Sequence, residues 1–238
     1  MKLSIIIPVF NEEKTIAEIL TRVNKVRIKD IEKEIIIVND GSSDNSGNII
    51  KKEISGIKNE VYISHVRNQG KGAAIRTAIK ASTGEYIIIQ DADLEYDPRD
   101  YEKLLRPIIQ KKAKVVYGTR LNRLPDFLKD ERTARFFIHY LGNKILSFIT
   151  SILYGQWITD METCYKIFPK KAVNDMRLNA KGFEFEPEIT AKLLKKGYNI
   201  HEIPISTIPR GYDEGKKLNT IKDGLKALVT LIKYRFRD

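Results

Sequence analysis

The stretch from residue 85 to residue 98, EYIIIQDADLEYDP, constrains the fold of this chain more than any other. Its apolar residues 86–89 are rich in β-branched side chains, a pattern typical of a strand buried on both faces of a parallel sheet. Asp91 and Asp93 follow directly where this strand ends. Because ligands bind beyond the carboxyl ends of the strands in an open parallel sheet, the stretch predicts an α/β fold with a polar site at this edge.

The spacing of Asp91 and Asp93 suits a divalent cation. Only one small residue separates the two aspartates, so their carboxylates can share a cation with a polyphosphate. Oxygen ligands favour Mg²⁺ or Mn²⁺ over softer metals. The alternative is an acidic surface turn without a ligand, which is a common use of aspartate.

Length and composition favour one α/β domain. With 238 residues, 42% of them hydrophobic, the chain can bury a substantial core. It has no uncharged apolar run of 18 residues, and it opens on the strand-like MKLSIIIPVF. We therefore expect neither a membrane-spanning helix nor a signal peptide, and a cytoplasmic location.

Cysteine, histidine and charge narrow the classes of function further. A single cysteine, Cys164, excludes an internal disulfide and a thiolate zinc site, and the three histidines lack a metal-binding spacing. The formal net charge of +11 indicates anionic partners: nucleic acid, anionic lipid headgroups or phosphorylated substrates. A nucleic-acid-binding module would show a basic patch with stacking aromatic residues rather than basic residues around acids, so we expect no nucleic acid.

The first expected strand, residues 3–9, leads into a loop with hydrogen-bonding side chains. A dinucleotide-binding loop would carry GxGxxG at this turn, and this chain does not. The residues in that place are Pro8, Phe10, Asn11 and Glu12. Their side chains either contact a nucleobase or ribose, or only cap the following helix.

Two more expected strands, residues 34–38 and 61–66, end in loops that suit a nucleotide. Asp40 follows the first and can accept hydrogen bonds from a ribose or base. RNQGKG follows the second, and its two glycines allow close backbone approach to a ligand. The helix expected over residues 73–81 presents its amino end to an anion, with Lys71 as a candidate phosphate ligand.

Basic and acidic residues recur later in the chain. Arg120 ends an expected strand at residues 115–117 and faces the acids, which suits a second phosphate. We expect residues 121–133 to form a mobile loop that carries Arg132. Asp160 and Glu162 lie in the semi-apolar WITDMETCYKIF, where acids are costly unless they pair with the basic loop or line the reaction site.

Two stretches have the pattern of amphipathic helices. Within residues 134–155, one helical face contains Phe137, Leu141, Ile145, Phe148 and Ile152. Gly142 is an expected break, which predicts a helix pair packed on the sheet or a segment lying in a membrane interface. Residues 219–238 predict a basic amphipathic helix that either anchors the protein electrostatically or packs on the sheet. The expected organisation is a catalytic domain over residues 1–218, including 134–155, followed by the helix at 219–238.

Taken together, the chain resembles the family-two glycosyltransferases, within the polyprenyl-phosphate branch typified by dolichyl-phosphate mannose synthase. The matching blocks include SIIIPVFNEE, IIIVNDGSSDNS, RNQGKGAAIRTA, GEYIIIQDADLEYDP, VVYGTR, TDMETCYKIF, GFEFEPEITAKLLKKGY and EIPISTIPR. The resemblance implies a nucleotide-sugar-binding Rossmann-like domain of the glycosyltransferase A type, with a mostly parallel sheet flanked by helices. It also implies amphipathic interface helices.

The resemblance also assigns roles to residues. It implies that Pro8, Phe10, Glu12 and Asp40 form the nucleoside pocket, and that Asp91 and Asp93 hold the metal and the diphosphate. Arg120 and Arg132 correspond to residues expected on the acceptor phosphate. Arg210, with Lys216, corresponds to residues expected near the donor diphosphate.

By this resemblance the expected activity is an inverting transfer of a hexose, mannose from GDP-mannose, onto a polyprenyl phosphate of the dolichyl type. Glu95 and the loop at residues 214–217 depart from mannose synthases, so UDP-glucose is the alternative donor. A catalytically idle scaffold is a further alternative. An anionic phosphate can attack without a strong base, whereas a hydroxyl acceptor would need one, with Asp160 or Glu162 as candidates. We expect a peripheral protein on the cytoplasmic face of the cell membrane, with a separate membrane-anchoring subunit as a possible partner.

Overall fold

The computed structural model describes residues 1–56, 59–121, 134–208 and 220–237. Three predicted site residues lie outside this part of the chain: Arg132, Arg210 and Lys216. The loop expected at residues 121–133 also lies outside it, except for Leu121.

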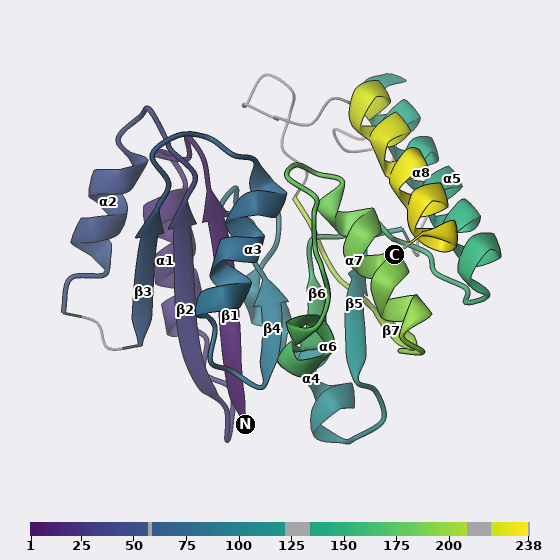
Figure 1. Ribbon diagram of the computed structural model, residues 1–238. Coiled ribbons are helices and arrows are strands. Elements are labelled where there is room, and N and C mark those ends of the chain that lie inside the picture. The colour runs from purple at the N-terminus through teal and green to yellow at the C-terminus, as the bar shows by residue number, and fades with distance from the viewer. Residues whose placement is uncertain (57–58, 122–133, 209–219, 238) are drawn as a thin grey trace.

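A seven-stranded sheet in the order β3-β2-β1-β4-β6-β5-β7 forms the centre of the molecule (Figure 1). The strands are β1 (Lys2–Val9), β2 (Glu32–Asn39), β3 (Glu60–Ser64), β4 (Tyr86–Ile89), β5 (Val115–Thr119), β6 (Lys166–Pro169) and β7 (Ile200–Pro204). All neighbouring strands are parallel except β6, which is antiparallel to β4 and β5. The predicted α/β fold with a mostly parallel sheet is confirmed.

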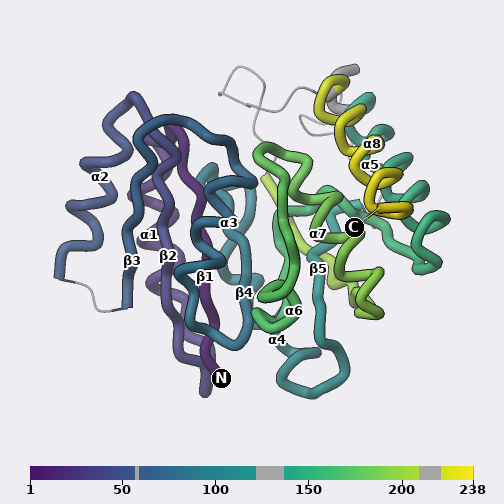
Figure 2. The backbone as a smooth tube through the Cα atoms, in the orientation of Figure 1, coloured from purple at the N-terminus to yellow at the C-terminus, as the bar shows by residue number. Residues whose placement is uncertain are grey.

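The buried strands form the core because their apolar runs have no polar face. Ile5 to Ile7 on β1 and Ile87 to Ile89 on β4 are fully buried, as expected for strands covered by helices on both sides. The helices are α1 (Ile16–Lys25), α2 (Ser46–Glu53), α3 (Lys71–Ala81), α4 (Tyr101–Ile109), α5 (Ala134–Tyr154), α6 (Lys170–Asn174), α7 (Phe185–Lys195) and α8 (Thr220–Phe236). A short 3-10 helix, Pro98–Asp100, precedes α4. The tube drawing shows α3 on one face of the sheet and α1 on the other (Figure 2).

The TDMETCYKIF block, for which the sequence named no strand, contributes one to the sheet. Its last residues form β6, which lies between β4 and β5 and separates two strands that follow each other in the chain. The local pattern did not predict β6, because the strand is short and its pairing is made entirely with residues distant in sequence.

The amphipathic stretch at residues 134–155 is one continuous helix, α5, rather than the expected pair broken at Gly142. A side chain at Gly142 would meet nothing within 4 Å, so no close contact requires a glycine at this position of the helix. The partner of α5 is α8, and both helices also contact α7 (Figure 1). None of the described helices is long and apolar enough to cross a membrane.

At the edge of the sheet where β1 and β2 begin, a buried acid joins three segments. Glu34 is 5% exposed and accepts hydrogen bonds from the Ser4 hydroxyl, from the Thr83 amide at 2.5 Å and from the Gly84 amide at 3.0 Å. Lys2 Nζ lies 3.0 Å from its Oε2 atom. Burial opposes ionisation, but the hydrogen bonds from Ser4 and Thr83 lower the pKa of Glu34 to about 2.

Candidate active site

The loops that follow β1, β2 and β4 meet at the carboxyl edge of the sheet around a cavity of about 310 Å³. We call it the strand-end cavity. It is lined by Pro8, Val9, Phe10, Glu12, Asp40, Asn68, Gly70, Lys71, Ala74, Asp91, Ala92, Asp93, Glu95, Gly182 and Phe183. The structure thus brings together all the described residues predicted to bind the nucleotide or the metal, with the exception of Asn11.

Asn11 contributes to the loops rather than to the cavity wall. Its side-chain oxygen accepts a hydrogen bond from the backbone amide of Ser43 at 2.8 Å. The backbone amide of Asn11 donates to the Ser42 hydroxyl at 2.9 Å. The residue has a positive φ of 49°, a conformation that asparagine tolerates better than most side chains. Asn11 therefore ties the loop after β1 to the loop after β2.

Asp40 is almost fully buried and is held by protein donors. Its carboxylate accepts from the Gln69 amide at 3.0 Å and from the Gly70 amide at 2.7 Å. His65 Nδ1 lies 2.6 Å from its Oδ1 atom. These contacts fix the loop in front of α3, a role that the position of Asp40 after a strand did not reveal.

The glycines of the GKG segment allow a close backbone approach, but the neighbour in the structure is protein. Gly70 has a φ of 99°, and a Cβ atom there would lie 2.3 Å from the Lys181 carbonyl oxygen. A Cβ atom at Gly72 would lie 2.8 Å from the Ala180 carbonyl oxygen. The Ala73 amide donates to the Lys181 oxygen at 3.0 Å, so part of the amino end of α3 is already capped.

Ion pairs connect α3, the acidic loop and α7 across the strand-end cavity. Lys71 Nζ lies 2.7 Å from Asp91 Oδ1 and 3.5 Å from Glu186 Oε1, while Lys166 lies 2.5 Å from Glu186 Oε2. Burial alone would lower the pKa of Lys71, but the charges of Asp91 and Glu186 raise it well above its ordinary value. These charges therefore stabilise the protonated, positively charged form of Lys71.

Asp93 lies in a setting that favours a cation beside it. Burial, followed by the charges of Asp91 and Glu95, raises the pKa of Asp93 to about 7. Among the described residues no group of three or more histidine, cysteine or acidic side chains is arranged to hold a metal alone. Asp91 and Asp93 therefore fit Mg²⁺ or Mn²⁺ that takes its other ligands from phosphate oxygens and water.

A buried polar network behind the acidic loop was missed in the sequence analysis. Gln90 accepts hydrogen bonds from the hydroxyls of Tyr101 at 2.6 Å and Tyr165 at 2.7 Å, and its amide nitrogen donates to the Asp91 carbonyl at 2.9 Å. The network joins α4 and the segment before β6 to the end of β4. A glutamine directly after a fully apolar strand was the available sequence signal.

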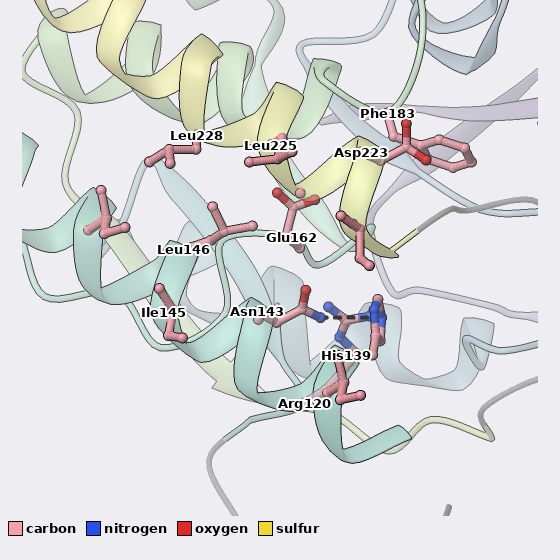
Figure 3. Close-up of a pocket in the computed structure, with 15 residues that line it drawn as sticks. Arg120, His139, Asn143, Ile145, Leu146, Glu162, Phe183, Asp223, Leu225 and Leu228 are labelled. Carbon is pink, nitrogen blue, oxygen red and sulfur yellow. Dashed lines mark hydrogen bonds between the residues drawn. The ribbon is translucent and has the colours of Figure 1, made fainter. Parts of the chain in front are cut away.

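A second cavity, of about 320 Å³, lies between α5 and α8 (Figure 3). We call it the helix-pair cavity. Its polar residues are Arg120, His139, Asn143, Glu162 and Asp223; its other lining residues are Ile138, Gly142, Ile145, Leu146, Ile149, Phe183, Ile221, Gly224, Leu225 and Leu228. Because Phe183 lines both cavities, the helix-pair cavity adjoins the strand-end cavity.

Arg120 reaches the helix-pair cavity as half of a buried ion pair. Its Nε and Nη2 atoms donate to the two carboxylate oxygens of Asp160 at 2.7 and 2.8 Å. The guanidinium carbon also lies 5.8 Å from the centre of the Tyr96 ring. Burial opposes ionisation of Asp160, but Arg120 holds the pKa of that carboxyl below its ordinary value. Asp160 is therefore a poor candidate for a general base.

The face of α5 directed toward the protein is polar, and its apolar face is exposed. Asn143, Ser147, Thr150 and Ser151 are buried. The predicted apolar face of α5 is exposed together with apolar residues of α8: Phe137, Leu141, Ile145, Phe148, Ile152, Ile221, Leu225, Val229, Ile232 and Phe236. We call these ten residues the apolar helix surface. Of the alternatives left open for these two helices, packing of the apolar faces on the sheet is wrong, because those faces are exposed and Ala227, Leu231 and Tyr234 are the buried residues of α8.

The family model described as "Glycosyl transferase family 2" matches residues 4–177. This match covers more than half of the chain and includes the loops after β1, β2 and β4. The chain therefore belongs to glycosyl transferase family 2 and is a glycosyltransferase, as the resemblance of its motifs indicated.

Two archaeal relatives are similar over almost the whole chain. The UDP-N-acetylglucosamine–dolichyl-phosphate N-acetylglucosaminyltransferase of Methanococcus voltae is 32% identical over 245 residues, covering 96% of this chain and 94% of the relative. Glycosyltransferase AglJ of Haloferax volcanii is 25% identical over 232 residues, covering 97% of this chain and 70% of the relative.

Solved structures confirm the predicted glycosyltransferase A-type fold. Glucosyl-3-phosphoglycerate synthase of Mycobacterium tuberculosis, in complex with UDP, superposes with a TM-score of 0.74 at 15% identity and covers 100% of this chain and 81% of that protein. A structure of the same synthase with Mn²⁺ and UDP-glucose also gives a TM-score of 0.74. At this identity the similarity establishes the fold alone.

Proposed function

We propose that this glycosyltransferase moves a sugar from a nucleotide diphosphate onto a polyprenyl phosphate at a membrane surface. The observation that carries the proposal is the position of the helix-pair cavity. It adjoins the strand-end cavity through Phe183, and its outer wall is made by the helices that carry the apolar helix surface. A polyprenyl phosphate has a polar headgroup and an apolar tail. The headgroup suits the polar residues of the helix-pair cavity, and the tail suits the apolar helix surface beside it.

The strand-end cavity is the proposed donor site. Asp91 and Asp93 would hold the cation, and Lys71 lies beside them to contact a phosphate oxygen. The bound cation would stabilise the charge of the departing diphosphate as a Lewis acid. Pro8, Phe10 and the other residues of the first loop would hold the nucleoside at the opposite end.

The helix-pair cavity is the proposed acceptor site. The acceptor phosphate is anionic at neutral pH, so its oxygen can attack the anomeric carbon without a strong base. Attack from the side opposite the diphosphate inverts the anomeric configuration. Arg120 lines this cavity, and its fork is held in place by Asp160. Arg132, which lies outside the described residues, remains a predicted second ligand of this phosphate.

Three donors are candidates. The motifs predict GDP-mannose, with UDP-glucose as the alternative, and the relative from Methanococcus voltae supports UDP-N-acetylglucosamine because its name specifies that donor and a dolichyl phosphate acceptor. The proposed ligands of the diphosphate, Lys71, Asp91 and Asp93, do not distinguish the base or the sugar, so all three donors remain candidates.

The test is a panel of these three donors with a polyprenyl phosphate in mixed micelles, with Mg²⁺ or Mn²⁺. The extracted lipid is analysed by mass spectrometry. A lipid whose mass has increased by one glycosyl residue, with no additional phosphate, supports the proposal. Transfer to a sugar hydroxyl, with no lipid product from any donor, would refute the lipid acceptor while leaving the enzyme class intact.

A further inference from the structure

Glu162 occupies an unusual position in the helix-pair cavity. Its side chain lies between α5 and α8 and lines the same cavity as Arg120 (Figure 3). Its Oε1 atom is buried and has no hydrogen-bond partner among the described residues. A buried carboxylate oxygen without a donor is costly, so a protonated carboxyl or a bound ligand is the expected way to stabilise it.

The cations near Glu162 are already paired. Arg120 is held by Asp160, and Lys166 is paired with Glu186 on α7. His139 from α5 and Asp223 from α8 line the same cavity, and His139 lies within 3.5 Å of Asn143 Nδ2. Asp160 and Glu186 therefore balance the charges of Arg120 and Lys166, the two cations that act on Glu162.

At neutral pH the carboxyl group of Glu162 is therefore protonated to a greater extent than that of an exposed glutamate. Burial raises the pKa of Glu162 to about 7, Glu186 and Asp160 act in the same direction, and Lys166 and Arg120 oppose them. An incoming phosphate would add a further negative charge beside this carboxyl. That charge favours the protonated form still more.

We propose that Glu162 keeps its proton when the acceptor binds and donates a hydrogen bond from its carboxyl group to an oxygen of the acceptor phosphate. The proposal rests on the proposed function, because it takes the acceptor to be a phosphate. During transfer a phosphate oxygen forms the new bond to the anomeric carbon, and the bond from that carbon to the diphosphate breaks with its electron pair leaving on the diphosphate. No proton moves in this step, so Glu162 remains protonated.

In this arrangement the protonation state of Glu162 controls the affinity for the phosphate acceptor. A protonated carboxyl donates to a phosphate, whereas an ionised one would repel it. Acceptor affinity should therefore fall as the pH rises through the pKa of Glu162, and the affinity for the donor should not follow the same profile.

The decisive variant is Glu162→Gln, because the amide has the shape of the protonated acid and donates a hydrogen bond at every pH. Steady-state kinetics with polyprenyl phosphate are measured from pH 6 to pH 8.5 for the wild type, Glu162→Gln and Glu162→Ala. The acceptor KM of the wild type is expected to rise by about tenfold or more over this range, relative to that of Glu162→Gln. Glu162→Ala should raise the acceptor KM about tenfold at pH 6 with kcat little changed.

Several controls separate this role from others. The acceptor phosphate itself titrates near pH 6, and the ratio to Glu162→Gln cancels that effect because both enzymes use the same acceptor. Glu102→Gln, which removes an exposed carboxylate of α4 that lines neither cavity, should keep the pH dependence of the wild type. Circular dichroism melting establishes that each variant is folded.

Two results would overturn the proposal. Superimposable pH profiles of wild type and Glu162→Gln would show that the carboxyl proton is not used. A loss of kcat by about 100-fold or more in Glu162→Gln at every pH, with an unchanged acceptor KM, would instead identify Glu162 as a general base. If the wild type forms no lipid product and glycosylates a hydroxyl acceptor, the proposed function fails first, and this proposal fails with it.

Discussion

Lys71 at the amino end of α3 reaches the acidic loop after β4, with its Nζ atom 2.7 Å from Asp91 Oδ1. The same nitrogen is 3.5 Å from Glu186 at the start of α7. The charge of the acidic loop is thus partly balanced by the protein before any cation or nucleotide binds. This contact places a fixed positive charge beside the site proposed for the donor diphosphate.

The first prediction concerns this lysine. Lys71→Gln should raise the KM for the donor by about tenfold or more, because a charged hydrogen bond to phosphate contributes about 1.5 to 3 kcal/mol. The matched control is Lys80→Gln, which removes an exposed lysine from the same helix. Equal donor KM values for the two variants would contradict a role of Lys71 at the diphosphate.

The second prediction concerns the cation. Asp93→Asn should lower kcat by about 100-fold or more with the fold retained, because the variant removes one of the two charges that would hold the metal. The measurements are turnover with Mg²⁺ or Mn²⁺, turnover in excess chelator, and circular dichroism. Full activity in chelator, or a fully active variant, is the result that excludes a cation at Asp91 and Asp93.

The third prediction concerns the buried ion pair. Arg120→Lys keeps the positive charge but loses the two-pronged contact with Asp160, since lysine cannot donate to both oxygens in one plane. The KM for the acceptor should rise about tenfold while the KM for the donor stays within about twofold. A rise for the donor alone would assign Arg120 to the other substrate.

The fourth prediction concerns membrane attachment. A polyprenyl tail does not leave the bilayer, because each methylene moved into water costs about 0.8 kcal/mol. We expect the apolar helix surface to contact lipid, with the exposed Lys222, Lys226 and Lys233 of α8 near anionic headgroups. Anionic vesicles should therefore bind the protein more tightly than neutral ones, and salt should weaken the binding.

The variant for this prediction is Phe137→Ser with Phe148→Ser, compared by vesicle flotation. The matched control is Val66→Ser with Ile109→Ser, which removes two exposed apolar side chains elsewhere on the protein. Only the first variant should lose flotation. Equal flotation of both variants and the wild type would rule out a lipid-facing role for α5.

The fifth prediction concerns stability and pH. The pKa of Glu34 is lowered to about 2 from an ordinary 4.5, so its stabilising contribution is complete above about pH 5 and is lost as the pH falls toward 2. Glu34→Gln should lower the free energy of unfolding at pH 7 by about 1 to 3 kcal/mol, because buried donors lose a charged acceptor.

The measurement is urea unfolding at pH 7 and at pH 3. The difference in stability between wild type and Glu34→Gln should shrink at pH 3, where the wild-type carboxyl begins to take up its proton on unfolding. A difference that is the same at both pH values would show that ionisation of Glu34 does not stabilise the fold.

The strands β1, β2, β3, β4 and β5 and the polar residues at their ends follow directly from the sequence. Because residues 87–89 are all isoleucine, both faces of this strand are apolar and must be buried. Asp91, which follows the strand, then lies at the edge of the sheet. The enzyme class could also be predicted from the sequence, because several of the family motifs lie at those strand ends. These are local properties, set by each residue and its neighbours along the chain.

The partners of the charged residues depend instead on segments brought together only by folding. Asp160 meets Arg120 from forty positions away, and the Lys181 carbonyl takes the place beside Gly70 that a phosphate was expected to approach. The orientation of α5 is a further example, because its hydrophobic pattern is the same whether the apolar face is buried or exposed. That face lies outside in the structure, because the polar face of α5 finds partners in the segment that follows the helix. The Met161 amide donates to the Ser147 hydroxyl, and the Ile158 amide donates to the Ser151 hydroxyl. A pattern along one helix contains no information about which neighbour supplies those partners.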